Sequence, residues 1–357
     1  MKHQKQFFVL TIFLLWSLLF AAEIPDSLKS INDGPYIFIT ESGLEVHTIE
    51  AGKHIQTTEN LPVTITVPKV NFEIDVITTD FDIQPFEYKD VSEIFILSDI
   101  HGQFDSFVKL LKNGNVIDDK LNWIFGEGHL VIIGDVFDRG DTETECLWLI
   151  YKLEREAWRN GGQVHFTYGN HEIMVMQNDL RYLNEKYIQT AEMMNIQIER
   201  RYDANSFLGK WLRTKNTIVE INNMLLCHAG ISCEIYYTGI KPRRINSLIR
   251  DNIGTKRDMI NSDKKLSLLF KSKGPIWYRG YFGESEDSGC YRDFAASHSY
   301  KKIIVGHTTQ DSIISIHKNL IIAVDAGLKY DDKGQALHWK EGVFYVIDID
   351  NKRKIFN

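Results

Sequence analysis

Three short apolar runs stand in the middle of the chain, and each of them ends in a group of polar residues. The runs cover residues 94–97, 130–133 and 164–168. Short apolar runs bounded in this way predict buried strands, and the longer segments between them repeat apolar residues at helical spacing. The pattern therefore predicts a β-α-β-α-β unit, in which functional groups gather beyond the carboxyl ends of the strands.

The polar groups at the ends of the runs contain side chains that bind metals. Two later apolar runs lead into histidines in the same manner, so that the candidate ligands are Asp99, His101, Asp135, Asn170, His228 and His307. Mixed imidazole and carboxylate ligands favour Zn, Fe or Mn over Ca or Mg. Six such groups are too many for one tetrahedral ion, but they fit two divalent ions roughly 3.5–4 Å apart. We assign Asp99, His101 and Asp135 to one ion, and Asp135, Asn170, His228 and His307 to the other.

The motifs around these ligands carry a family resemblance. They read, in order, Asp99-x-His101-Gly102, Gly134-Asp135-x-x-Asp138-Arg139-Gly140, Gly169-Asn170-His171-Glu172, His228-Ala229-Gly230 and Gly306-His307. This order resembles the calcineurin-like metallophosphoesterase superfamily, and the Asp-Arg-Gly and Asn-His-Glu forms look like its phosphoprotein phosphatase branch. Residues 209–213, 274–280 and 325–327 are similar to motifs of the bacterial Shewanella-like phosphatases. The resemblance spans about residues 91–327 and implies an α/β protein with a four-layer α/β/β/α sandwich.

The resemblance also implies roles in the hydrolysis of a phosphate ester. A hydroxide that bridges the two metals would attack phosphorus, with His171 as the general acid and Asp138 orienting it. An imidazole near its pKa is suited to protonating a leaving oxygen, and an arginine can hold a phosphate with two hydrogen bonds. The candidate phosphate-binding residues are Arg139, Arg279 and Asn170, with Arg213 as the rival of Arg279.

The amino-terminal region divides into two parts. Residues 1–22 place two lysines before an almost wholly apolar run that ends at Ala21-Ala22, which is typical of a secretory signal peptide. Cleavage would give a periplasmic or secreted enzyme, whereas an uncleaved segment would anchor it to the membrane. Residues 23–90 alternate like half-exposed strands and predict a small β-rich extension, in which His47 and His54 are expected at the surface.

The catalytic domain is expected over residues 91–350. Within it, residues 232–300 form an insert between two strands that carry ligands, and we assign this insert to substrate recognition. Four cysteines are too few for a disulfide scaffold. A single bridge between Cys233 and Cys290 is one alternative to free thiols.

Composition sets further bounds on function. The chain has 357 residues, 43% of them hydrophobic and 25% charged, as in an ordinary globular protein. A net charge of −7 without a long basic run gives no indication of nucleic acid binding. We favour a phosphorylated protein, at Ser/Thr or Tyr, as the substrate. The alternatives are a nucleotide or dinucleotide phosphohydrolase on the same metals and a catalytically silent, metal-bound binding module, and the oligomeric state stays open.

Overall fold

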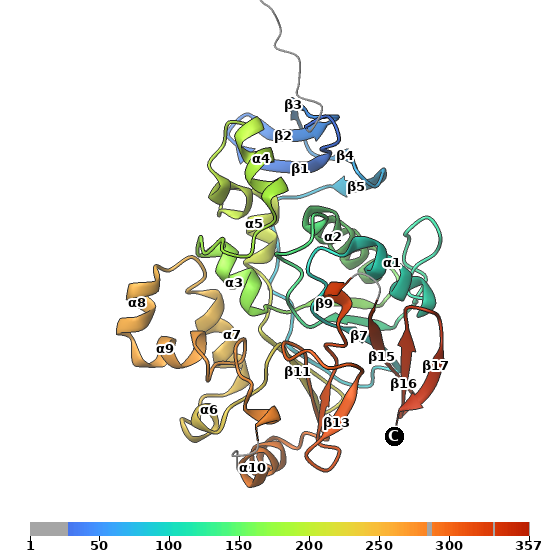
Figure 1. The fold of residues 1–357 in the computed structure, drawn as a ribbon, viewed down its shortest axis with the longest axis vertical. Coiled ribbons are helices and arrows are strands. Elements are labelled where there is room, and N and C mark those ends of the chain that lie inside the picture. Colours follow the sequence, from blue (N-terminus) through green and yellow to red (C-terminus); the bar gives the residue numbers. More distant parts are fainter. Residues whose placement is uncertain (1–27, 284–287, 331–332, 357) are drawn as a thin grey trace, which may run out of the picture.

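A computed structural model describes residues 28–283, 288–330 and 333–356 (Figure 1). The predicted signal segment, residues 1–22, lies outside these ranges. Among the described residues, no helix combines the length and the apolar character needed to cross a membrane.

The first of two central sheets contains the three predicted strands. Its strand order is β17-β16-β15-β7-β8-β9. The strands β7 (Glu93–Leu97), β8 (His129–Ile132) and β9 (Gln163–Phe166) run parallel to one another. The strands β15 (Gln335–Lys340), β16 (Val343–Asp348) and β17 (Arg353–Phe356) each pair with their neighbours in antiparallel orientation. Ile94 and Ile96 face the core between the sheets, while Phe95 and Leu97 belong to the core beneath the helices. Because both faces are buried, these strands are continuous apolar runs.

The second sheet has the order β13-β14-β12-β11-β10-β6. Its strands are β6 (Glu87–Tyr88), β10 (Ile218–Ile221), β11 (Met224–Cys227), β12 (Lys302–Val305), β13 (Ile314–Ile316) and β14 (Ile321–Ala323). β11, β12 and β14 run parallel to one another. The edge strand β6 comes from the amino-terminal extension, so the extension contributes directly to this sheet.

Helices cover the outer face of each sheet. α1 (Phe104–Asn113) and α2 (Glu143–Arg159) share a core with the first sheet, and α1 buries Phe104, Phe107, Leu110 and Leu111 on one side. The insert forms α6 (Cys233–Tyr237), α7 (Pro242–Arg250), α8 (Arg257–Ser262), α9 (Lys264–Phe270) and α10 (Ser288–His298), which share a core with the second sheet. The four-layer α/β/β/α arrangement is therefore confirmed, and the insert is chiefly the outer layer of the second sheet.

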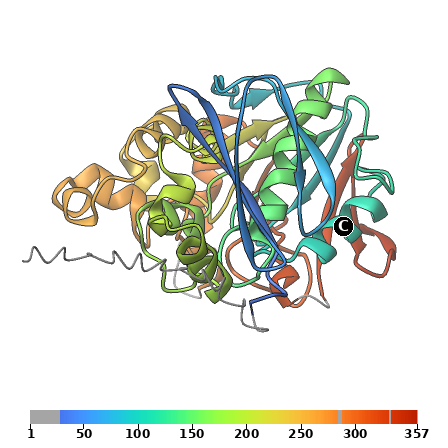
Figure 2. The same cartoon turned by 90° about the horizontal axis from the view of Figure 1, so that it is seen from above.

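One covalent link joins two helices of the insert, which lies to one side of the molecule. A disulfide between Cys233 and Cys290 joins α6 to α10. In Figure 2 the insert helices lie on the left and the carboxyl-terminal strands on the right, with the amino-terminal sheet in front of the centre.

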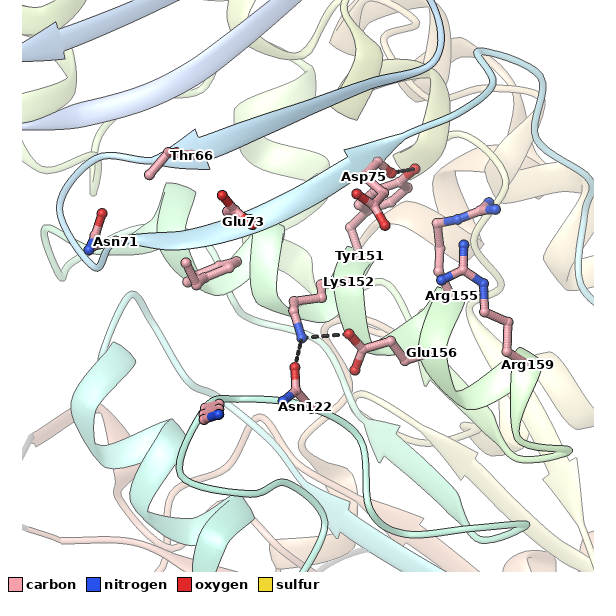
Figure 3. Close-up of a pocket in the computed structure, with 12 residues that line it drawn as sticks. Thr66, Asn71, Glu73, Asp75, Asn122, Tyr151, Lys152, Arg155, Glu156 and Arg159 are labelled. Carbon is pink, nitrogen blue, oxygen red and sulfur yellow. Dashed lines mark hydrogen bonds and ion pairs between the residues drawn. The ribbon is translucent and has the colours of Figure 1, made fainter.

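The amino-terminal extension forms a sheet of β1 (Asp33–Thr40), β2 (Gly43–Glu50) and β3 (Lys53–Glu59), followed by a hairpin of β4 (Val63–Val67) and β5 (Phe72–Val76). Apolar side chains of both parts join the core around α1 and α2. A cavity of about 590 Å³ lies between the hairpin and α2, and none of the predicted metal ligands lines it (Figure 3). The extension therefore packs on the catalytic domain.

One expectation for the extension was wrong. His54 is exposed as predicted, but His47 is only 5% exposed. The ring of His47 packs edge-on against Phe38 and is stacked on His54, with His47 Nδ1 3.0 Å from His54 Nε2. His54 thus shields His47 from solvent.

Candidate active site

The six predicted metal ligands lie together at the carboxyl ends of the central strands. They follow β7, β8, β11 and β12, or begin α3 (Asn170–Met176), and each is between 0% and 4% exposed: Asp99, His101, Asp135, Asn170, His228 and His307. Strands of both sheets end at this place, so residues more than 200 positions apart meet in one cluster. The sequence positions of the ligands are therefore explained by the fold.

Asp135 lies at the centre of the cluster. Its Oδ2 atom is 3.2 Å from His228 Nε2, 3.6 Å from His101 Nε2 and 3.9 Å from His171 Nε2. Its Oδ1 atom accepts a hydrogen bond of 3.0 Å from the backbone N–H of His171. One carboxylate thus borders ligand atoms on two sides, as a bridging ligand must.

The other ligands complete the two sides. Asn170 Oδ1 and His307 Nδ1 each lie 3.1 Å from His228 Nε2. On the opposite side, Asp99 Oδ1 lies 4.0 Å from His101 Nε2. Asp99 Oδ2 accepts the backbone N–H of His307 at 2.9 Å, which joins the first and last motifs of the chain.

The chemistry of the donor set fits divalent metals. His101 Nδ1 lies 2.8 Å from the carbonyl of Phe137, and His228 Nδ1 lies 2.8 Å from that of Ile133. A ring nitrogen that donates its proton to a carbonyl leaves the other nitrogen free to bind a metal. The Nε2 lone pairs of His101 and His228 then face the Asp135 carboxylate and other acceptor atoms. A cluster of acceptor atoms of this kind binds a cation. Two groups satisfy the spacing for one ion each: His101, Asp135 and His171, and Asp135, His228 and His307.

The local backbone is shaped for this convergence. Asp99, His101, Asp135 and His307 all have positive φ angles, between 47° and 65°, and such conformations concentrate at functional sites because they persist only where the surroundings enforce them. A Cβ at Gly169 would lie 2.1 Å from Asp135 Oδ1. Only glycine therefore allows the third motif to approach Asp135 so closely.

Glu172 holds the loop that carries Asp135, a role that the sequence did not reveal. It is fully buried, and its Oε2 atom accepts the N–H groups of Asp135 at 2.9 Å and Gly169 at 2.7 Å. Its Oε1 atom accepts those of Val136 at 2.7 Å and Phe137 at 3.3 Å. The carboxylate is thus a structural anchor behind the ligands.

His171 and Asp138 form a buried pair beside Asp135. His171 Nδ1 is 2.6 Å from Asp138 Oδ2. Burial opposes a charge on His171, but the carboxylates of Asp135 and Asp138 outweigh it and raise its pKa. At His101, by contrast, burial dominates and lowers the pKa to about 3. The two carboxylates therefore favour the protonated form of His171, whereas burial keeps His101 a neutral imidazole.

Two of the predicted arginines lie at the site, and the rival does not. Arg279 Nη1 donates to the carbonyl of His307 at 3.0 Å and to Thr308 Oγ1 at 3.1 Å. Arg213 Nη1 instead donates to the carbonyls of Tyr202 and Gly209, both at 2.8 Å, and thereby fixes the end of α5 (Phe207–Leu212). Position therefore favours Arg279 over Arg213, and the stretch around Arg279 is the part of the insert that reaches the ligands.

Tyr182 forms a rim between His171 and the predicted phosphate-binding Arg139. Its ring centroid is 5.3 Å from that of His171, and the guanidinium of Arg139 lies over the tyrosine ring at 5.6 Å. The tyrosine is 45% exposed. Nothing in its sequence context, a loop between α3 and α4 (Glu185–Met193), singles it out.

A two-sheet sandwich with buried carboxylate and imidazole groups at its strand ends, and a paired histidine and aspartate beside them, defines a metal-dependent phosphoester hydrolase. Residues 92–311 match the family model of the calcineurin-like phosphoesterases, and the chain belongs to this family.

Similar proteins include a cold-active protein-tyrosine phosphatase of a psychrophilic Shewanella species, whose crystal structure has a TM-score of 0.87 and 34% sequence identity and covers 92% of this chain and 100% of its own. Shewanella-like protein phosphatase 1 of Plasmodium berghei is 28% identical over 250 residues, which are 66% of this chain and 67% of the relative. A symmetrical bis(5'-nucleosyl)-tetraphosphatase of Vibrio cholerae is 29% identical over 139 residues, 39% of this chain and 44% of the relative. The predicted resemblance to Shewanella-like phosphatases is confirmed.

Proposed function

We propose that the protein is a two-metal phosphomonoesterase that acts on phosphorylated proteins, with phosphotyrosine as the favoured target. The observation that carries this proposal is the position of Asp135, whose carboxylate borders imidazoles on both sides while His171 and Asp138 lie next to it. Asp99, His101 and Asp135 would hold one ion, and Asp135, Asn170, His228 and His307 the other. Mn, Fe and Zn all suit these ligands.

The ions would lower the pKa of water and neutralise charge on the phosphoryl oxygens. The protein contributes the positions of the ligands, because the Nδ1 atoms of His101 and His228 are occupied by backbone carbonyls. Arg139 and Arg279 would bind the outer phosphoryl oxygens with charge-assisted hydrogen bonds, and Asn170 would contact the phosphate as well as a metal.

His171 would protonate the leaving oxygen. Asp138 fixes the Nδ1 atom of the His171 ring at 2.6 Å and thereby directs Nε2 towards Asp135 and the ligand cluster. A positioned acid of this kind contributes about 10²–10⁴-fold to rate. Asp138 stabilises the charged ring and fixes its orientation.

An aromatic leaving group suits the surroundings of His171. The exposed part of Tyr182 lies beside the His171 ring and offers a face on which a phenol ring can pack. The similarity to a protein-tyrosine phosphatase over 92% of this chain supports the same substrate class. Similarity to a dinucleotide hydrolase over 39% of the chain keeps nucleotide hydrolysis as the second candidate.

We infer that the enzyme works outside the cytosol, in the periplasm or secreted. The apolar segment within residues 1–22 supports export. The disulfide between Cys233 and Cys290 supports an oxidising compartment, since such bonds are rare where thiols are kept reduced.

Metal reconstitution tests the proposed chemistry. Metal-stripped protein is reloaded with Mn, Fe, Zn or Mg and assayed on p-nitrophenyl phosphate, beside the variants Asp135→Asn and His171→Asn. Activity that returns with metal and is lost in Asp135→Asn supports the two-metal reaction. A folded, metal-loaded protein without turnover on any phosphomonoester would refute it and favour the binding module.

A second assay separates the substrate classes. Phosphotyrosine peptides, phosphoserine peptides and a dinucleoside tetraphosphate are compared by kcat/KM at the same metal loading. A preference for phosphotyrosine supports the proposal, whereas a strong preference for the dinucleotide would transfer the function to nucleotide hydrolysis.

A further inference from the structure

The turn that carries Asp138 and Arg139 is strained. Both residues have φ of 70°, in the left-handed region that side chains other than glycine rarely adopt. Such a conformation persists only where its surroundings enforce it. The contacts that hold this turn therefore decide where the Asp138 carboxylate lies.

Glu143, in the first turn of α2, supplies one of these contacts. Its Oε2 atom accepts the backbone N–H of Asp138 at 3.0 Å, and the residue is fully buried. Neither the metal ligands nor the phosphate-binding residues include it. Its carboxylate contacts the backbone of Asp138, whose side chain in turn contacts His171.

Other buried side chains fix Glu143 in turn. Tyr202 Oη donates to Glu143 Oε1 at 2.8 Å, and Arg201 Nη1 lies 3.6 Å from the same oxygen. Arg201 is 1% exposed, and its guanidinium lies over the rings of Tyr187 and Tyr202 at 4.8 Å and 5.1 Å. Tyr187 Oη also accepts the backbone N–H of Glu143 at 2.6 Å. Glu143 is thus held through both of its carboxylate oxygens and through its backbone N–H group.

The extension closes this network from outside. Tyr36 of β1 hydrogen-bonds Asp33 Oδ2 at 2.7 Å and contacts Thr144 Oγ1 at 3.1 Å, next to Glu143. Trp148 Nε1 of α2 donates to the carbonyl of Pro35 at 2.9 Å. The first two turns of α2 are therefore fastened to the amino-terminal sheet.

We propose that Glu143, held by Tyr202 and Arg201, is a positioning residue for the proton-donor pair His171–Asp138. The inference rests on the proposed function of His171 as the general acid. Loss of the Glu143 acceptor would let the strained turn relax, so that Asp138 no longer orients the His171 ring. Protonation of the leaving oxygen would then suffer, while the metal ligands stay in place.

The leaving group provides a readout that a purely structural role would not change. A poor leaving group such as phenolate depends on protonation far more than p-nitrophenolate does. The test compares kcat of the metal-loaded full-length protein on phenyl phosphate and p-nitrophenyl phosphate. Glu143→Ala should lose about tenfold more rate on phenyl phosphate than on p-nitrophenyl phosphate, a fraction of the general-acid contribution.

Glu145→Ala is the matched control. It removes another buried carboxylate two residues further along α2, one that makes no hydrogen bond to the Asp138 turn. The ratio of the two rates should stay at the wild-type value in this variant. Glu143→Gln, which keeps one acceptor oxygen, should recover most of the ratio lost in Glu143→Ala.

If Glu143→Ala does not fold, the variant Tyr202→Phe tests the same proposal. This variant removes only the hydroxyl that holds Glu143 Oε1 and should shift the ratio in the same direction by a smaller factor. Equal losses on both substrates in the folded Glu143 and Tyr202 variants, or no loss at all, would overturn the positioning role.

His171→Asn separates this failure from a failure of the proposed function. If His171→Asn discriminates strongly between the two substrates and Glu143→Ala does not, only the role of Glu143 is refuted. If His171→Asn itself shows no discrimination, the assignment of His171 as the proton donor falls, and the positioning role falls with it.

Discussion

Replacement of Glu172 by glutamine should strongly destabilise the protein. The carboxylate accepts four backbone N–H groups, two on each oxygen. A glutamine retains one oxygen and turns an NH₂ group towards the other two donors. Two hydrogen bonds to a charged group are therefore lost, and each contributes about 1.5–3 kcal/mol. The free energy of unfolding should fall by about 3–6 kcal/mol, a large part of the usual stability of a domain.

The same change should weaken metal binding. The N–H groups concerned belong to residues 135–137, so the loop that carries Asp135 loses its anchor. Loss of a residue that orients metal ligands typically reduces metal affinity 10–100-fold. Urea unfolding and Mn titration of Glu172→Gln measure both effects. Glu127→Gln, an exposed position, is the control and should stay within about 0.5 kcal/mol of the wild type. A Glu172→Gln protein within 1 kcal/mol of the wild type, with unchanged Mn affinity, would refute the reasoning.

Three further predictions follow from single contacts. Arg279→Met should raise KM for phosphotyrosine peptides at least tenfold with unchanged thermal stability. Arg213→Met should lower Tm and leave KM unchanged. The reverse outcome would exchange the roles of the two arginines. Burial, opposed by Lys186 and supported by Asp33, raises the pKa of Glu145 to about 7, so the folded state binds the extra proton and stability should fall as pH rises from about 4.5 to about 7. Urea unfolding across this range should show less decline for Glu145→Gln, and an identical decline would contradict the shift. Cys233→Ser should lower the free energy of unfolding by about 2–4 kcal/mol, and a reducing agent should do the same to the wild type but not to the variant.

The strands, and the candidate ligands at their ends, were predictable because their causes are local. β7, β8 and β9 are buried on both faces and so appear as continuous apolar runs, and each ligand follows such a run directly. β3 could not be found in this way. All but one of its side chains are exposed, and it pairs with β2 through backbone hydrogen bonds that leave no apolar pattern.

The residues that support the site arise from contacts between distant segments. Glu143 meets Tyr202 across 59 positions, and Tyr182 reaches His171 from a loop without a distinctive pattern. Glu172 stands within a recognised motif, yet three of its four partners lie 35 to 37 positions earlier in the chain. Sequence spacing identifies the candidate ligands. The contacts that hold these ligands in place form only when the strands and helices pack, so the sequence does not predict them.

Glu172 and Glu143 play the same structural role, since each carboxylate accepts backbone N–H groups of the loop after β8. Each is in the first turn of a helix that follows a central strand, where the helix dipole favours a negative charge. Glu172 accepts the N–H groups of residues 135–137 and Glu143 that of Asp138, so four consecutive N–H groups of one loop end on two buried carboxylates. This loop carries both Asp135, the proposed bridging ligand, and Asp138, the partner of the proposed proton donor. Because one loop serves both functions through separate anchors, a change at Glu172 should affect metal binding first, and a change at Glu143 should affect protonation first.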